Sequence, residues 1–222
     1  MNPDWSLLDS SAPVAPLVGP FVRSPFLSLL ERHHGPPESV PHIVGRQAGA
    51  VAFERSDAGL ALLGPRDLVD YRSPVGDVGP VLVEMFEATD SGTAISLDSL
   101  PLEAVEVFGR AFASIGFDAE PKENESAAVL QLPSTFDDYM AAIGKKERHE
   151  IRRKGRRLSE ELGDLSVESF DSPGPPLDHF FRFHRQATGD KGTFMTPQMM
   201  AFFTALLGLP GWQLATLRGG EG

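Results

Sequence analysis

The sequence predicts an α/β fold in which helices flank a mixed β-sheet. Segments with strand and helix patterns follow one another without a regular strand–helix–strand repeat, which favours a mixed sheet over a parallel one. The chain has 222 residues, 41% of them hydrophobic and fifteen of them Phe, so it can bury a core as one large domain or two small ones. It has no Cys, which excludes disulfides, Cys-ligated zinc and thiol nucleophiles.

The first quarter of the chain predicts an N-terminal segment without regular structure, then a helix and a hairpin. Residues 1–20 hold four prolines and little periodicity, so we expect an extended or disordered N-terminus. Residues 24–33 predict a short helix with Ser24 as its cap and Pro25 at its first position. Residues 42–55 predict a hairpin, because two apolar runs flank a glycine-containing turn.

The middle of the chain predicts further sheet strands and one clear helix. We expect strands at 58–64, 93–100 and 127–133, since each is a short apolar run between turn residues. Residues 80–88 are too short a run to decide between helix and strand by period. Residues 102–116 predict an amphipathic helix that ends at its terminal glycine.

The second half predicts a basic helix followed by alternating strands and helices. Ser134 and Thr135 offer caps to a helix that begins near Phe136. Gly144 interrupts it, and the basic helix that follows ends at Gly163. The remaining predicted elements are a strand at 165–170, a helix at 177–187, a helix at 197–207 capped by Thr196, and a strand at 212–217.

The last residues predict the first half of a hairpin. A strand leads into the glycine-rich turn at 218–222, and no returning strand follows. We therefore expect a truncated domain or a fragment of a longer product. The alternative is an edge strand with a frayed tail.

The positive charge of this acidic chain is concentrated in one short segment. The net charge is −11, yet eight of the thirteen residues at 145–157 are Lys or Arg and two are Glu, a local charge of +6. The remainder carries −17, from twelve basic and 29 acidic residues. This asymmetry predicts a local anion-binding surface. Nucleic acid is not the expected partner, because a nucleic-acid-coating protein is more often basic throughout.

On a helix, the basic segment has an apolar stripe and a cationic face. The stripe consists of Ile143, Ile151, Leu158 and Leu162. The candidate anion-binding residues lie away from it in two rows: Lys146, Arg153 and Arg157 in one, and Lys145, Arg152 and Arg156 in the other. We expect the stripe to pack on a sheet. The alternative is a solvated helix in which Glu side chains pair with the cations, at about 0.2–0.5 kcal/mol per pair.

Three further residues are candidates for substrate contact. Asp70 and Tyr71 lie in the loop after the strand at 58–64, where Asp70 is also suited to capping local N–H groups. His184 follows an aromatic run and has a side chain that titrates near neutral pH, but no Ser or carboxylate is evidently arranged with it. No metal-ligand spacing is present, so we expect no metal site.

The termini and apolar runs suggest a cytoplasmic protein without a membrane span. The N-terminus lacks a basic region followed by an apolar run, so it does not have the pattern of a signal peptide. No apolar run approaches the length of about 20 residues that crosses a bilayer. The oligomeric state does not follow from the sequence.

Several segments together resemble the GNAT-like acetyltransferase family of cellulose and capsule biosynthesis, which is related to the FemAB peptidyltransferases. The segments are "IGKKERHEIRRKGRRLSEELG", "FFRFHRQATGDKGTFMTPQMMAFFTALL" and "GWQLATLRGGEG", preceded by "SPFLSLLERH", "LALLGPRDLVDYRSPVG" and "ISLDSLP". Each is degenerate, and their order and spacing carry the resemblance over about residues 21–222. It implies a degenerate GNAT-like lobe at 21–133 and, at 134–222, the basic helix with the incomplete beginning of a second lobe.

The resemblance implies acyl transfer from a thioester to an amine or hydroxyl of a saccharide or amino-acid-like acceptor. The implied cofactor is acetyl-CoA or another acyl-CoA, and the implied partners are a small-molecule acyl donor and acceptor. Asp70 and Tyr71 would face the cleft between the lobes. The main cofactor loop and the general base would lie past Gly222, so the catalytic residues are unknown and the truncated chain is expected to be inactive.

The nearest match to the GNAT pyrophosphate loop is Arg46–Val51, which we interpret as a hairpin turn because strand-like residues follow it. Two other functions stay open. One is a non-catalytic module whose basic helix binds an anionic partner such as RNA, acyl carrier protein or a membrane surface. The other is a degenerate structural domain without a ligand.

Overall fold

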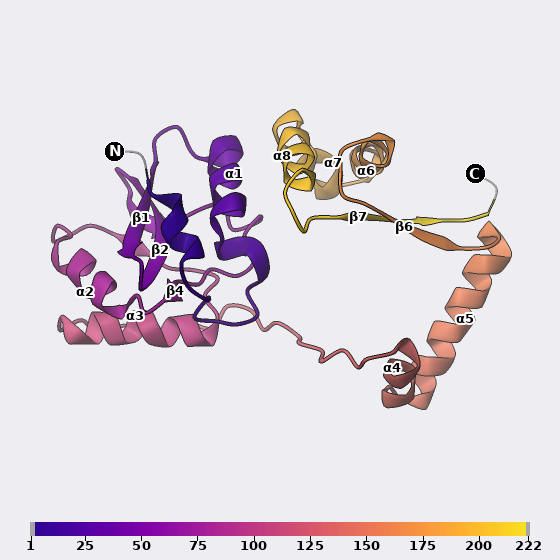
Figure 1. Cartoon of the computed structure of the whole chain (residues 1–222), viewed down its shortest axis with the longest axis horizontal. Coiled ribbons are helices and arrows are strands. Elements are labelled where there is room, and N and C mark those ends of the chain that lie inside the picture. Colours follow the sequence, from indigo (N-terminus) through magenta and orange to yellow (C-terminus); the bar gives the residue numbers. More distant parts are fainter. Residues whose placement is uncertain (1–2, 221–222) are drawn as a thin grey trace.

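The computed structural model describes residues 3–220 and is a mixed α/β structure. An N-terminal part carries a five-stranded sheet, and a C-terminal part carries a two-stranded ribbon with three helices. A helical pair, α4 and α5, lies between them in the chain; it stands away from the N-terminal part and meets the C-terminal part at the end of the two-stranded ribbon (Figure 1). The predicted mixed sheet with flanking helices is therefore confirmed.

The N-terminal segment differs from the expected extended or disordered lead-in. Two 3₁₀ helices form at Trp5–Asp9 and Gly19–Val22. Leu8 and Val18 are buried beneath them, and the Arg23 Nη1 donates hydrogen bonds to the Leu8 and Ser11 carbonyls at 2.9 and 2.7 Å. Burial of these apolar side chains offsets the entropy cost of ordering a proline-rich segment, an effect that local periodicity does not reveal.

Helix α1, Ser24–His34, begins as predicted, with Pro25 in its first turn. Its cap position is Arg23 and not Ser24. The Asp9 carboxylate accepts from the Ser24 backbone N–H at 3.1 Å and from the Ser24 hydroxyl. The Asp9 carboxylate thus provides a hydrogen-bond acceptor for a backbone N–H at the start of this helix, which has no partner within the helix.

The N-terminal sheet is mostly antiparallel with one parallel edge. Its strands are β1 (Val40–Arg46), β2 (Gly49–Ser56), β3 (Gly59–Leu62), β4 (Val75–Gly76) and β5 (Ile95–Ser96). Strands β1 and β2 form the predicted hairpin, β3 continues it antiparallel, and β5 pairs parallel to β3. The short β4 pairs with the start of β2.

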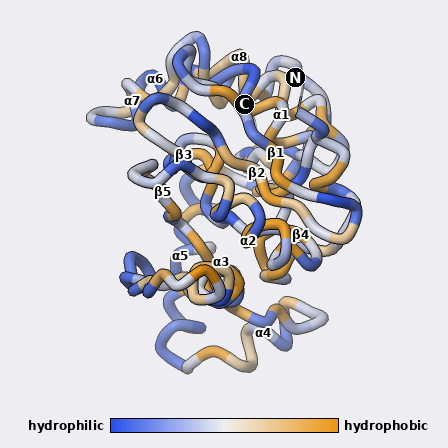
Figure 2. The backbone as a smooth tube through the Cα atoms, turned by 90° about the vertical axis from the view of Figure 1, so that its left-hand side faces the viewer, coloured by the Kyte–Doolittle hydropathy of each residue, from blue (hydrophilic) through white to orange (hydrophobic). Residues whose placement is uncertain are grey.

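Strand β2 is buried on both faces. Its alternate residues Val51 and Phe53 face helices α2 (Gly79–Glu87) and α3 (Leu102–Ser114), whereas Ala50 and Ala52 face α1 and the N-terminal segment. Central strands of this kind appear as continuous apolar runs, and the tube is largely hydrophobic here (Figure 2). The sequence did not decide between helix and strand for residues 80–88. In the structure they form helix α2, whose apolar side chains cover this face of the sheet.

Residues 117–133 have no helix or strand, so the strand predicted at 127–133 is wrong. Val129, Leu130 and Leu132 are 63%, 60% and 79% exposed. A β-strand needs a neighbour that pairs with its backbone, and no strand among the described residues lies beside this segment. The segment instead extends away from the N-terminal part and connects α3 to α4 as an exposed stretch of chain (Figure 1).

The C-terminal part has the predicted elements and one further short helix, α7 (Asp190–Phe194), that was not predicted. Strands β6 (Ser166–Phe170) and β7 (Leu214–Arg218) form an antiparallel ribbon. Helices α6 (Pro175–Gln186), α7 and α8 (Pro197–Leu207) lie between them in sequence. The Thr196 hydroxyl accepts from the Met199 N–H at 3.2 Å, which confirms the predicted cap.

One apolar core joins the two parts. Phe202 of α8 is 1% exposed and packs edge-on against Phe26 and His34 of α1. Trp212 stacks on Phe26 with ring centroids 5.7 Å apart. The expected boundary between residues 133 and 134 falls near the exposed connection, but this core crosses it in space.

None of the helices in the described range has the length and apolar character required to cross a membrane.

Candidate anion-binding site

Helix α5, Lys145–Leu162, has clear local start and stop signals. Helix α4, Phe136–Ala142, precedes it, with the Thr135 hydroxyl accepting from the Asp138 N–H at 3.1 Å. Gly144 separates the two helices, as predicted. At the other end, Gly163 has φ = 77°, a left-handed conformation that glycine adopts readily and that terminates the helix.

The cations of α5 form an exposed surface. Lys145, Lys146, Arg152, Arg156 and Arg157 are exposed, and no carboxylate lies within 4.0 Å of their side chains among residues 3–220. The helix lies at the far end of the β6–β7 ribbon from the N-terminal sheet (Figure 1). Two rows of positive side chains therefore face solvent along three to four helical turns.

Arg153 is the exception among the six candidate residues. It is half-buried, and its Nε and Nη2 donate to the Glu150 carboxylate at 2.9 and 2.6 Å. This hydrogen bonding lowers the pKa of Glu150 to about 2. The carboxylate therefore stays ionised until the pH falls to about 2. Arg153 is less available to an external anion than its neighbours.

The charge order of α5 opposes the stability of the helix. Lys145 and Lys146 lie in the first turn, where the helix dipole disfavours cations. Glu160 and Glu161 lie in the last turns, where it disfavours anions. The like-charged pairs Arg148–Arg152, Arg152–Arg156 and Arg153–Arg157 are four residues apart, and each such pair destabilises a helix by about 0.2–0.5 kcal/mol. Glu147 in the first turn and the pairs of Glu150 with Arg153 and Lys154 offset part of this cost.

The prediction that the apolar stripe packs on a sheet is wrong. Ile151 and Leu162 are 38% and 44% exposed, Leu158 is half-buried, and no residue of α5 is buried. The contact that holds the helix is at its C-terminal end, where Gly219 lies so close to Leu162 that a Cβ would collide with it. The prediction failed because the periodicity of a sequence identifies an apolar helix face but not the surface on which that face packs.

We expect Ile151→Asp to change the free energy of unfolding by less than about 1 kcal/mol, because the side chain is exposed and surface substitutions have small effects. Urea denaturation measures this. Leu206→Asp in the buried face of α8 is the matched control, and it should cost several times more. A loss of about 3 kcal/mol or more for Ile151→Asp would mean that the stripe is covered in solution.

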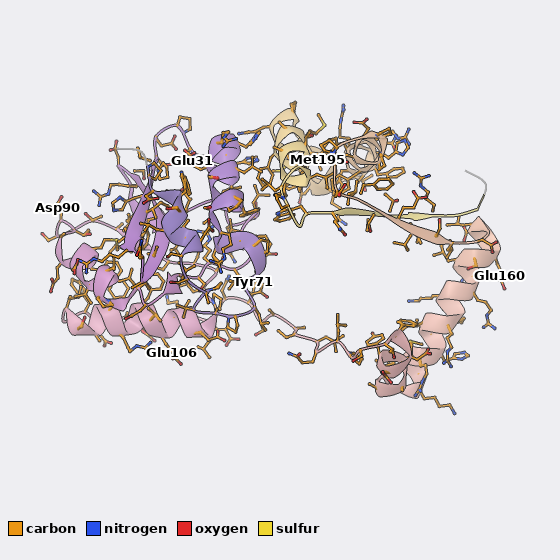
Figure 3. The ribbon with its side chains drawn as sticks, in the orientation of Figure 1. Glu31, Tyr71, Asp90, Glu106, Glu160 and Met195 are labelled. Carbon is orange, nitrogen blue, oxygen red and sulfur yellow. The ribbon has the colours of Figure 1, made fainter. Side chains whose placement is uncertain are left out.

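Asp70, Tyr71 and His184 do not join the basic surface. Asp70 is exposed, and Tyr71 is half-buried against the core shared by α1 and α8. Figure 3 places Tyr71 on the N-terminal part and Glu160 of α5 at the opposite end of the molecule. The candidate residues therefore lie in three separate places: the cations on α5, Asp70 and Tyr71 in a loop, and His184 on α6. They do not form a single site.

His184 lies on α6 beside an aromatic ring. Its centroid is 4.5 Å from that of Phe180, and its Nδ1 is buried without a hydrogen-bond partner in the described part of the chain. No Ser or carboxylate hydrogen-bonds to it there. His184 therefore packs against Phe180, and no nucleophile among residues 3–220 is placed for it to act on as a general base.

Arg72 follows Tyr71 in the same predicted loop, for which a substrate-lining role is one interpretation, but its burial was not predicted from the sequence. Its guanidinium is 7% exposed and donates to the Leu62 and Gly64 carbonyls at 2.8 and 2.5 Å. Asp98 lies 3.1 Å away, and burial lowers the pKa of Arg72 while Asp98 opposes that shift. The Arg72 side chain therefore holds the loop after β3 against the end of that strand through these hydrogen bonds. The sequence offers little indication that Arg72 would be buried, since Arg in a loop usually lies at the surface.

The residues present do not form a phosphate cradle for an acyl-CoA. The Arg46–Gly49 turn joins β1 to β2, so no helix N-terminus follows it, as the hairpin interpretation predicted. At the start of α2, Pro80 has no N–H, and the Asp77 N–H already donates to the Ala48 carbonyl at 2.8 Å. The Asp77 carboxylate would also repel a pyrophosphate there.

The starts of α1, α6 and α8 are also unsuited to binding a pyrophosphate. Asp9 occupies the start of α1, and Thr196 caps α8. Helix α6 begins with Pro175 and Pro176, which lack donors. The described residues also contain no group of three or more His, Asp or Glu placed to hold a metal ion.

The fold and site together define a mixed α/β protein with an exposed cationic helix. In comparisons with known proteins, no family model, curated protein or solved structure matches the chain.

Proposed function

We propose that the chain is part of a GNAT-like acyltransferase in which α5 attracts an anionic acyl donor or acceptor. The observation that carries the proposal is the charge order of α5. Lys145 and Lys146 lie in the first turn, where the helix dipole disfavours cations. Arg152, Arg156 and Arg157 are exposed and have no carboxylate within 4.0 Å among residues 3–220. A bound anion would offset both effects, because guanidinium groups fit carboxylate and phosphate oxygens well.

The architecture supports the two-lobe organisation that the resemblance implies. The N-terminal sheet carries an antiparallel meander, then a helical crossover through α2 to the parallel strand β5. The C-terminal part begins a second α/β unit with its own ribbon. In this proposal, residues 21–133 are the degenerate first lobe and residues 134–222 begin the second.

The proposed chemistry is direct attack of an amine or hydroxyl on an acyl thioester. The enzyme would orient the reactants, donate hydrogen bonds to the developing oxyanion and remove a proton. The described residues supply electrostatic attraction through Lys145, Lys146, Arg152, Arg156 and Arg157. We assign no residue as general base, and we place the acyl-CoA pyrophosphate outside the residues described.

We expect the 222-residue chain to bind acetyl-CoA weakly or not at all. The reason is that backbone N–H groups at the N-termini of α1 and α8 already donate hydrogen bonds to Asp9 and Thr196. The N-termini of α2 and α6 contain prolines, which lack an N–H donor. Isothermal titration calorimetry measures the affinity directly. A micromolar dissociation constant would contradict this expectation, and loss of that binding in Arg46→Ala, whose side chain is exposed, would assign the cofactor to the turn between β1 and β2.

The acyltransferase proposal is tested by a thiol-release assay. The protein as its gene encodes it should release thiol from acyl-CoA when amino sugars or amino acids are supplied. The absence of thiol release with all of these acceptors would overturn the proposal.

The exposure of α5 favours a second candidate, a non-catalytic module that binds an anionic macromolecule. The two candidates differ in salt dependence. Binding to nucleic acid weakens steeply with salt, with a slope set by the number of phosphates contacted, whereas attraction of a small anion weakens less. Strong RNA binding that disappears when Arg152, Arg153, Arg156 and Arg157 are changed to Gln would favour the module over the enzyme.

A further inference from the structure

A groove of about 750 Å³ lies between helices α6 and α8, away from the basic helix. Its volume is within the range of about 300–1,000 Å³ that is typical of small-molecule sites. None of the residues predicted as functional lines it. Its lining consists of Asp178, Phe181, Arg182, Arg185, Gln186, Pro197, Met200, Ala201 and Thr204.

The two walls of the groove differ in character. Helix α6 contributes polar groups at positions 178, 182, 185 and 186, a spacing that places them on one helical face. Helix α8 contributes mainly apolar atoms from Pro197, Met200 and Ala201, and the buried Phe181 adds an aromatic ring. A ligand in the groove would therefore meet charge on one side and apolar surface on the other.

The two arginines of the groove are available to a ligand. Neither Arg182 nor Arg185 has a carboxylate within 4.0 Å among residues 3–220. The Arg182 guanidinium carbon lies 5.5 Å from the centre of the Phe183 ring, a contact that restrains this side chain. Two exposed guanidinium groups that line a partly apolar groove are suited to binding an anion.

We propose that this groove binds an organic carboxylate with an apolar body. The carboxylate would lie between Arg182 and Arg185, and the apolar body along Phe181, Met200 and Ala201. Asp178 lies one turn before Arg182 and about 10 Å along the helix axis from Arg185. Its negative charge favours a singly charged carboxylate over a doubly charged phosphate and can accept a hydrogen bond from an amine or hydroxyl at the other end of the ligand.

This inference is independent of the proposed acyl transfer, since it needs only the geometry of α6 and α8. The probe is 4-phenylbutyrate, a carboxylate with an aromatic body. Its titration into the ¹⁵N-labelled chain should shift amide resonances of α6 and α8 saturably, and those of α5 much less. The uncharged 4-phenylbutyramide should bind at least about tenfold more weakly, because it lacks the anion.

Two variants with equal net charge separate a specific site from general attraction. Arg182→Gln/Arg185→Gln should weaken 4-phenylbutyrate binding at least about tenfold, and Arg152→Gln/Arg156→Gln on α5 should leave it within about twofold. All four side chains are exposed, so both variants should keep the circular dichroism spectrum of the parent. Equal weakening by both variants, shifts that do not saturate, or no binding at millimolar concentration would overturn the proposal.

Discussion

Phe202→Ala should lower the free energy of unfolding by about 3–5 kcal/mol, the range for removing a fully buried aromatic ring. Phe202 is 1% exposed, and its centroid lies 5.1 Å from that of His34 and 6.2 Å from that of Phe26. The cavity would open where α8 packs on α1. Since this contact joins the N-terminal and C-terminal parts, its loss should also weaken their association.

Urea denaturation of the variant measures this effect, and Phe183→Ala is its control. Phe183 lies on α6 and is 63% exposed, so its removal should cost less than about 1 kcal/mol. Near-ultraviolet circular dichroism of Trp212, which stacks on Phe26, reports the same interface. Equal stability of the two variants would mean that α8 does not pack on α1 in solution.

Arg72→Ala should lower the free energy of unfolding by about 3 kcal/mol. The substitution leaves the Leu62 and Gly64 carbonyls without their donor, and hydrogen bonds to charged groups contribute about 1.5–3 kcal/mol each. It also removes the charge partner of Asp98. Lys cannot reproduce the forked guanidinium geometry, so Arg72→Lys should recover only part of the loss.

The control for Arg72 is an exposed arginine in an ion pair. Arg46 lies 2.6 Å from Glu84, but both side chains are more than half exposed. Arg46→Ala should therefore cost less than about 1 kcal/mol in the same urea experiment. If Arg72→Ala costs no more than Arg46→Ala, the guanidinium of Arg72 is not buried in the solution structure.

Elements with strong local signals were predicted correctly from the sequence. Thr135, Gly163 and Thr196 set helix ends through caps and backbone conformation, which depend on a few neighbouring residues. The β1–β2 hairpin was likewise fixed by its short turn. Local chemistry decides such features before any tertiary contact forms.

Features that depend on distant partners were not predicted. Residues 3–20 fold because their apolar side chains reach a core built largely from other segments. The segment at 127–133 has strand-like composition but no strand beside it. For the same reason, the cationic rows of α5 were found from sequence, whereas the exposure of its stripe and the groove beside Arg182 and Arg185 were not.

The central claim, that the cations of α5 form an anion-binding surface, is tested most directly by calorimetric titration with tripolyphosphate at low salt. Two variants that each lose four positive charges are compared: Arg152, Arg153, Arg156 and Arg157 changed to Gln, and the exposed Arg32, Arg55, Arg66 and Arg110 changed to Gln. We predict that the α5 variant binds at least about tenfold more weakly than the parent, that the control variant binds within about threefold, and that parental binding weakens as salt rises. Equal binding by the two variants, or no binding by the parent, would contradict the account.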